Sequence, residues 1–212
     1  MQVFVSRPTW VSKEFEEGLD TFITLIENLG LVPRTLGVTD YPSKSPMDEV
    51  IEIMQSCKGA VILGYPQLQV TKGTLKGALI NSELVLATEW NHLEAGLAYA
   101  AGLPLLVLHH TSVTRGVFDR GVLNAFLHSV DFGVPNWAMQ PAINGAIKKW
   151  KQECVSGSSS YGGANKQKVI PGKPICPNCS GTNKAVYLSP IPTPFNSVAG
   201  GDWECSVCKY VE

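Results

Sequence analysis

The sequence lacks a charge excess, a long apolar run and the signs of a secretory leader. Its 212 residues carry a formal net charge of −1, so the charge balance does not point to nucleic acid or to an anionic membrane as a partner. The longest apolar runs, such as residues 103–108, are too short to cross a bilayer. The first residues read as a strand, without the charged and apolar regions of a signal peptide. We therefore expect a cytoplasmic protein with no membrane partner.

Strand and helix patterns alternate through the first 154 residues. Apolar strands are predicted at residues 3–5, 31–36, 60–63 and 105–108, and helical periodicity follows them near residues 15–26, 45–54, 89–101 and 140–153. Residues 65–88 read as a long, weakly patterned connection, and a short fifth strand is predicted near residues 130–132. These repeated units predict an α/β domain with a parallel, flavodoxin-like sheet. Neither a Rossmann nor a Walker phosphate motif is present, which disfavours both of those nucleotide sites.

Four of the six cysteines form two Cys-x-x-Cys pairs near the C-terminus. The pairs are Cys176 with Cys179 and Cys205 with Cys208. Two residues between cysteines let both sulfur atoms of a turn face one metal ion, and two such turns complete a tetrahedral thiolate site. The alternatives are two disulfides in a secreted protein and a redox Cys-x-x-Cys. We expect a small zinc ribbon that holds one structural zinc ion.

A stretch rich in serine and glycine separates the two parts of the chain. It cannot bury enough apolar surface to order itself, so it is predicted to be a flexible linker. The predicted organisation is an α/β domain over residues 1–154, a linker over residues 155–173 and the zinc ribbon over residues 174–212. The ribbon contains few basic residues, which favours protein contact or simple stabilisation over a nucleic-acid partner.

Several polar residues follow the predicted strands at the edge where a parallel sheet binds its ligands. Ser6 and Arg7 end the first strand, and Tyr65 follows the third. Arg7 suits a phosphate, which Ser6 would help to orient. Arg115 and Arg120 follow the fourth strand and suit a phosphate clamp, although a solvated loop with an internal arginine–aspartate pair is the alternative. We expect these five residues to bind the substrate.

Glu94 lies in a helical segment that consists largely of small and apolar residues. It shares a helical face with Trp90 and Ala98. A carboxylate in such a setting is poorly explained as a solvated surface charge. The alternatives are that Glu94 caps another element or lies at a rim, and that Trp90 packs in the core. We expect Glu94 to be catalytic and Trp90 to stack on a base or on nicotinamide.

The segment from Glu94 to Pro104 resembles a known signature. It matches the pattern Glu-x-Gly-x-Ala-x-Ala-x-Gly-x-Pro of nucleoside 2-deoxyribosyltransferase-like proteins, in which the glutamate is the nucleophile. It also resembles the Trp-x-x-x-Glu helix of TIR domains, in which the glutamate lies against the ribose of NAD. Residues 3–7 and 56–63 are similar to two strands of TIR domains, so the likeness covers residues 1–110. Deoxyribosyltransferases carry acidic residues roughly where Gly59 and Thr88 stand here. This difference favours the resemblance to TIR domains over the resemblance to deoxyribosyltransferases.

The resemblance implies a TIR-like enzyme that cleaves or rearranges the N-glycosidic bond of NAD or a related nucleotide. Loss of a base leaves positive charge on the sugar, which a carboxylate such as Glu94 stabilises or captures. TIR-like proteins often act in immune signalling or anti-phage defence after forming homo-oligomers, and we expect the same here. The alternatives are a nucleoside or nucleotide glycosidase or deoxyribosyltransferase, and a non-catalytic sensor that binds a nucleotide signal and oligomerises.

Overall fold

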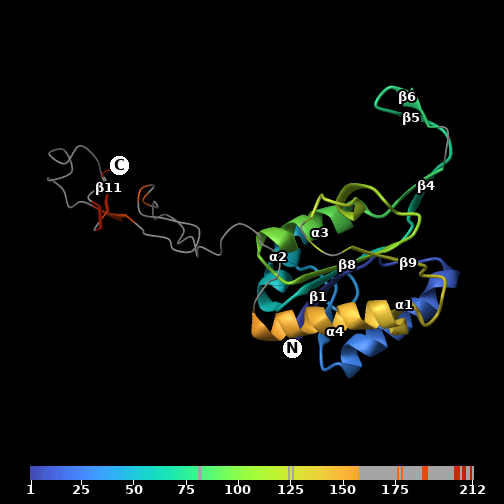
Figure 1. Cartoon of the computed structure of the whole chain (residues 1–212), viewed down its shortest axis with the longest axis horizontal. Coiled ribbons are helices and arrows are strands. Elements are labelled where there is room, and N and C mark those ends of the chain that lie inside the picture. The colour runs from blue at the N-terminus through green and yellow to red at the C-terminus, as the bar shows by residue number, and fades with distance from the viewer. Residues whose placement is uncertain are drawn as a thin grey trace. The chain divides into compact units, whose positions relative to one another are not determined.

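The chain forms two compact units, Met1–Gly163 and Ala164–Glu212 (Figure 1). The computed structural model describes residues 1–80, 83–123, 125, 127–157, 176, 178, 188–190, 203–205, 207–208 and 211. Residues 158–173 of the predicted linker, and Cys179 of the predicted zinc site, lie outside the described residues. Within the described residues, no helix has both the length and the apolar character needed to span a membrane.

The first unit is built around a five-stranded parallel sheet. In spatial order its strands are β2 (Val32–Arg34), β1 (Gln2–Ser6), β3 (Ala60–Gly64), β8 (Leu105–His110) and β9 (Leu127–Val130). Every residue of β3 is buried, as expected for a central strand that is covered on both faces. Counted along the chain, the five strands have the flavodoxin-like order 2-1-3-4-5. The predicted α/β fold with a parallel, flavodoxin-like sheet is confirmed.

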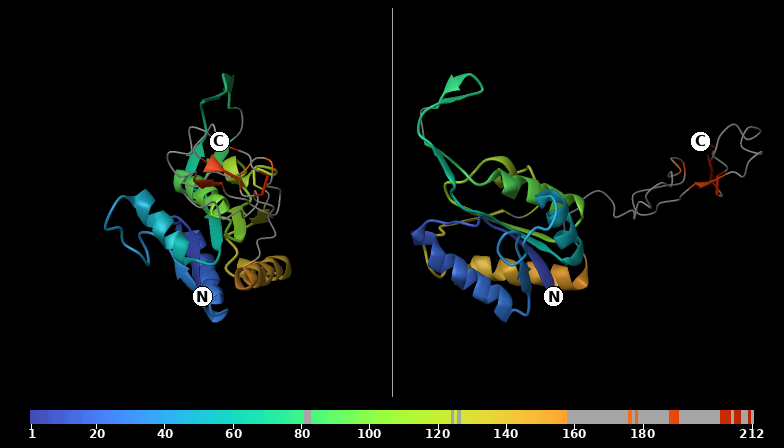
Figure 2. Two further views of the ribbon diagram at one scale, coloured as in Figure 1. Left: turned by 90° about the vertical axis from the view of Figure 1, so that its left-hand side faces the viewer. Right: turned by 180° about the vertical axis from the view of Figure 1, so that it is seen from behind.

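Helices cover both faces of this sheet (Figures 1 and 2). On one face lie α1 (Lys13–Asn28) and α4 (Pro141–Ser156), and on the other lie α2 (Pro46–Ser56) and α3 (Glu89–Ala100). Alternation along β1 separates the two cores: Val3 and Val5 pack with α1 and α4, whereas Phe4 packs with α2 and α3. The next residue of β1 that faces α3 is Ser6.

Gly59 lets α4 approach the start of β3. A Cβ atom at this position would lie 2.3 Å from Cys154 Sγ and 3.2 Å from the Pro104 carbonyl oxygen. The same carbonyl accepts a hydrogen bond from Trp150 Nε1 at 3.0 Å. The docking of α4 on the sheet therefore requires that no side chain is present at residue 59.

The connection between β3 and α3 contains structure that the sequence pattern did not predict. It holds two antiparallel pairs, β4 (Leu68–Val70) with β7 (Leu84–Leu86) and β5 (Thr74–Leu75) with β6 (Ala78–Leu79). Figures 1 and 2 show these strands extending away from the sheet as an arm. A bridge between Val85 and Val113 fastens the base of the arm to the loop after β8. Strands of two or three residues carry too little periodicity to be predicted from the sequence.

Three other elements begin or end at residues other than those predicted. The strand β2 is shorter than the predicted residues 31–36, and β9 ends at Val130, where the fifth strand was expected to begin. The helix α4 continues to Ser156, beyond the predicted end at residue 153. Two short 3-10 helices, η1 (Gly116–Phe118) and η2 (Trp137–Met139), lie in the loops after β8 and β9. In the second unit, β10 (Ser189–Pro190) pairs antiparallel with β11 (Trp203–Glu204).

Candidate functional site

The first turn of α3 positions the candidate catalytic residue. Thr88 caps this helix, because its Oγ1 accepts a hydrogen bond from the Asn91 backbone N–H at 3.1 Å. The buried face of α3 then consists of Asn91, Glu94, Ala95 and Ala98. The small alanine side chains allow the helix to pack closely on the sheet. Glu94 is therefore held on the buried side of the helix, where only 7% of the residue is exposed.

A chain of hydrogen bonds connects the cap of α3 to Ser6, which lies near this carboxylate. Thr88 Oγ1 donates to Asn91 Oδ1 at 2.9 Å, and Asn91 Nδ2 donates to Ser6 Oγ at 2.8 Å. The Ser6 side chain in turn acts on Glu94 and lowers the pKa of its carboxyl group. Ser6 and Asn91 are each 1% exposed, so these two members of the network are almost completely shielded from water. The structure thus brings Ser6 near Glu94 and adds two polar residues, Thr88 and Asn91, that the sequence analysis did not propose for the site.

Burial dominates the electrostatics of Glu94. It raises the pKa of the carboxyl from 4.5 to about 7, and hydrogen bonding with Ser6 opposes the rise. No ion pair joins Glu94 to a basic group in the described part of the chain. The carboxyl is therefore partly ionised near neutral pH, and its charged form has no fixed counter-ion. A cationic centre placed beside it would lower its pKa and be stabilised in return.

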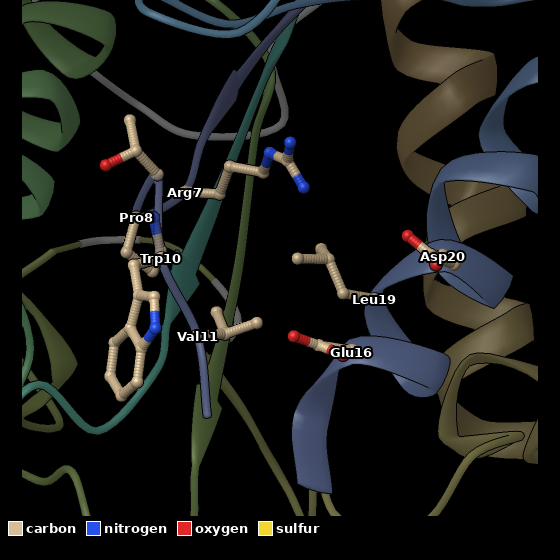
Figure 3. A pocket seen from close by; sticks show the side chains of 8 residues that line it. Arg7, Pro8, Trp10, Val11, Glu16, Leu19 and Asp20 are labelled. Atoms are coloured by element: carbon tan, nitrogen blue, oxygen red, sulfur yellow. The ribbon is translucent and has the colours of Figure 1, made fainter. Parts of the chain in front are cut away.

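Arg7 and Tyr65 lie on the other face of the sheet. Arg7 directly follows β1, and Figure 3 shows its side chain on the α1 side, facing Asp20 across a cavity of about 270 Å³. Burial lowers the pKa of the Arg7 guanidinium, and the negative charge of Asp20 opposes that shift. Tyr65 is fully buried and stacks on Phe132 with the ring centroids 4.1 Å apart. The structure does not bring either side chain to the candidate carboxylate.

The alternation of side chains along a strand explains why Arg7 lies on the opposite face of the sheet from Ser6 and Glu94. Successive side chains of a strand point to opposite faces, so Arg7 must face away from α3 if Ser6 faces toward it. Tyr65 stands one residue past β3 and joins the core beneath α1 and α4. Sequence position alone placed both residues at the ligand edge of the sheet but did not assign their faces.

Trp90 lies one helical turn before Glu94 at the start of α3. It is 40% exposed, so it does not pack in the core. An exposed indole one helical turn from a buried carboxylate is available for stacking on a planar ligand.

The two arginines after β8 have different surroundings. Both arginines are exposed, but only Arg120 lines a cavity, together with His109 and Asp119. No ion pair joins Asp119 to either arginine among the described residues. The structure therefore does not show the clamp of two arginines that the sequence suggested.

The helical spacing could have identified Asn91. It stands three residues before Glu94 and therefore on the same face of the helix, as Trp90 does at four residues. Thr88 is a favoured cap type directly before the helix. The contact between Asn91 and Ser6 spans 85 residues, and nothing in one sequence predicts such a pair.

Comparisons with known proteins identify a similar solved structure. No protein family and no curated protein matches the sequence. Among solved structures, the chain is similar to the CMP N-glycosidase BcmB of Clostridium botulinum, with a TM-score of 0.44 and 13% sequence identity. The match covers 67% of this chain and 97% of that one. A likeness at this level carries no argument about activity.

Three described cysteines converge in the second unit. The sulfur atoms of Cys176, Cys205 and Cys208 all lie within 4.8 Å of one another, and Cys176 Sγ is 3.5 Å from Cys208 Sγ. The backbone N–H of Cys208 is the main cause that lowers the pKa of the Cys205 thiol to about 6, which favours the thiolate form that binds metals. This donor set fits zinc, and the fourth predicted ligand, Cys179, lies outside the described residues. Structural zinc remains a prediction.

Proposed function

We propose that the first unit is a nucleotide N-glycosidase in which Glu94 is the catalytic carboxylate. One observation carries the proposal: a glutamate is buried near Ser6 at the carboxyl end of β1 and has no cationic partner among the described residues. A buried acid without a counter-charge is destabilising for the fold, and such groups occur preferentially at functional sites. Its place, at the edge where parallel sheets bind ligands, agrees with a catalytic role.

The chemistry follows from the charge that develops on the sugar. As the bond between the anomeric carbon and the base breaks, its electron pair leaves with the base, and the carbon and ring oxygen share a positive charge. Glu94 stabilises that charge in a site of low dielectric constant, or captures the carbon as an ester. Water then supplies the hydroxyl group of the sugar, and its second proton goes to the base. The net reaction converts a nucleotide and water into a sugar phosphate and a free base.

Ser6 and Asn91 act as positioning residues in this scheme. Because Asn91 Nδ2 donates to Ser6 Oγ, the hydroxyl proton of Ser6 is free to point at Glu94. This hydrogen bond fixes the direction of the carboxylate and favours its ionised form. A carboxylate held in place before the substrate arrives needs little reorganisation in the transition state.

The finer assignments rest on the resemblance to TIR domains. They are an NAD substrate, a role in immune signalling or anti-phage defence, a homo-oligomeric assembly and a cytoplasmic location, and all four stay predictions. The alternative activity, base transfer by a deoxyribosyltransferase, would use a second base in place of water. A sensor would bind a nucleotide in the same place without releasing a base.

The test is a base-release assay on the full chain. The purified protein is incubated separately with NAD, ATP, CMP and deoxynucleosides, and free base is measured by chromatography. Glu94→Gln should lower turnover on the order of a hundredfold or more, because it removes the charge that stabilises the transition state. The matched control is Glu89→Gln, which makes the same change at an exposed position of the same helix and should retain activity. Normal turnover by a folded Glu94→Gln protein would remove Glu94 from the mechanism.

A further inference from the structure

A cavity of about 300 Å³ lies between the ends of β8 and β9 and the loop that joins them. Its polar lining comes from one imidazole, one carboxylate, one guanidinium and two hydroxyl groups: His109, Asp119, Arg120, Thr114 and Ser129. Phe118 and Leu127 supply apolar walls. Both apolar residues pack with the core beneath α2 and α3, so the cavity opens on the same side of the sheet as Glu94.

The loop that lines this cavity is held by specific contacts. Gly116 adopts a φ of +66°, and a Cβ atom there would lie 2.4 Å from the ring of His92. The Val117 N–H donates to His92 Nδ1 at 3.3 Å. The Phe118 ring fills the space above Gly64, where a Cβ atom would lie 2.6 Å from it. Because three successive residues are fixed, the next two, Asp119 and Arg120, are presented by an ordered backbone.

The lining offers both donors and acceptors with balanced charge. Asp119 carries one negative charge and Arg120 one positive charge, and no ion pair joins them among the described residues. His109 Nδ1 lies 3.0 Å from the His110 carbonyl oxygen, to which it donates, so its Nε2 is left as an acceptor. A phosphate in this cavity would be repelled by the negative charge of the Asp119 carboxylate. A neutral, planar ring with donors and acceptors on its edge complements this lining better.

The cavity lies within reach of the candidate carboxylate. Ser6 pairs with Ile62 in β3, and Gly64 pairs with His109 in β8. His109 is therefore two strands away from Ser6 and two residues further along the strand direction. Adjacent strands lie about 4.8 Å apart and each residue advances about 3.3 Å, so the Cα atoms of Ser6 and His109 are roughly 12 Å apart. A sugar held at Glu94 can direct its base toward His109 over that distance.

We propose that this cavity binds the base of the substrate and selects bases that carry an exocyclic amine beside a ring-nitrogen acceptor, such as cytosine and adenine. The inference rests on the proposed glycosidase activity. Asp119 accepts a hydrogen bond from the amine, and Arg120 donates to the neighbouring ring nitrogen. Uracil and hypoxanthine place a carbonyl oxygen where the amine would be, so the Asp119 carboxylate would face a second acceptor.

Binding of free bases to the full chain tests the selection without requiring turnover. Isothermal titration calorimetry is run with the pairs cytosine and uracil, and adenine and hypoxanthine. We expect the amine-bearing member of each pair to bind about tenfold to a hundredfold more tightly, the discrimination typical of one good hydrogen-bonded pair. Asp119→Asn should lower that preference, since its amide can donate to a carbonyl. Arg120→Ala should weaken the binding of cytosine and adenine, whose ring nitrogen accepts its hydrogen bond, more than that of uracil and hypoxanthine, whose ring nitrogen carries a hydrogen at that position. Lys148→Ala, an exposed position of α4 on the other face of the sheet, is the control that should change nothing.

The outcomes separate this inference from the activity. Three results would overturn the inference, even if the chain releases bases in the turnover assay. They are equal affinity within each pair for the wild-type chain, no measurable binding of cytosine and adenine, and a preference that is unchanged in Asp119→Asn. A preference that Asp119→Asn lowers, in a chain without turnover, supports the cavity as a base-binding site and refutes the glycosidase activity instead. Where turnover occurs, the ratio of kcat/KM for CMP against UMP should fall by the same factor in Asp119→Asn.

Discussion

Replacing Glu94 with glutamine should make the protein more stable at pH 8 and change its stability little at pH 5. The buried carboxyl has a pKa of about 7 in the folded protein, against 4.5 for an exposed glutamate. Below pH 4.5 the group is protonated in both the folded and the unfolded chain, so its burial brings no charge penalty. Above pH 7 it is ionised in both, and the full penalty applies. The contribution of Glu94 to stability therefore falls as the pH rises between these values.

The size of the effect follows from the same shift. At about 1.4 kcal/mol for each tenfold change in proton affinity, a rise from 4.5 to about 7 destabilises the folded protein at pH 8 by on the order of 3 kcal/mol. Glutamine has the same shape and does not titrate, so the variant escapes this penalty. At pH 5 the variant loses only part of one hydrogen bond with Ser6, about 1 kcal/mol. Most of the difference should therefore appear between pH 5 and pH 8.

The assay is urea unfolding of the wild type and both glutamine variants at pH 5, 6, 7 and 8, followed by far-UV circular dichroism. Comparing variants at each pH cancels the titration of all other groups. Glu89→Gln is the control, because this glutamate is exposed on the same helix and its replacement should give no pH-dependent difference. If the difference between Glu94→Gln and the wild type is the same at pH 5 and pH 8, Glu94 does not titrate as a dry carboxyl and the reasoning above is refuted.

Two further predictions concern the second unit and the packing of the first. Metal analysis should find about one zinc ion per chain, and chelation should unfold residues 174–212, because metal binding and folding are coupled in such modules; an intact fold without metal contradicts this. Gly59→Ala should destabilise the first unit by about 1–3 kcal/mol in thermal unfolding, because its Cβ would overlap Cys154 Sγ. The control, Gly96→Ala, has no atom within 4 Å and should stabilise α3 by about 0.5–1 kcal/mol; equal effects would contradict the packing account.

The sheet could be predicted from the sequence because its central strands are covered on both faces. Residues 60–63 form a continuous apolar run, which is the pattern of such a strand, and the structure places it in β3. The helix around Glu94 was predicted at residues 89–101 and is observed at Glu89–Ala100. Both signals depend on residues close together in the chain. The arm between β3 and α3 was missed, since strands of two or three residues form only through their pairing.

The site was predicted in part for the same reason. Glu94 stood out because its helical neighbours are small and apolar, which is a local signal. Its contact with Ser6, and the contact of Ser6 with Asn91 over 85 residues, depend on how the sheet is assembled. Arg7 and Tyr65 were grouped with Glu94 because their positions follow strands, but the face of a side chain depends on where each strand ends.

The cap of α3 also has a consequence for folding. The Thr88 side chain accepts a hydrogen bond from the Asn91 N–H in the first turn of the helix and orients the Asn91 amide, which holds Ser6 toward Glu94. Formation of this first turn and placement of Ser6 are therefore coupled. A chain in which the first turn of α3 frays would keep its sheet and most of its core, yet Ser6 would lose the hydrogen bond from Asn91 that holds it toward Glu94. Brief local opening of one helical turn would thus switch the site off long before the domain unfolds.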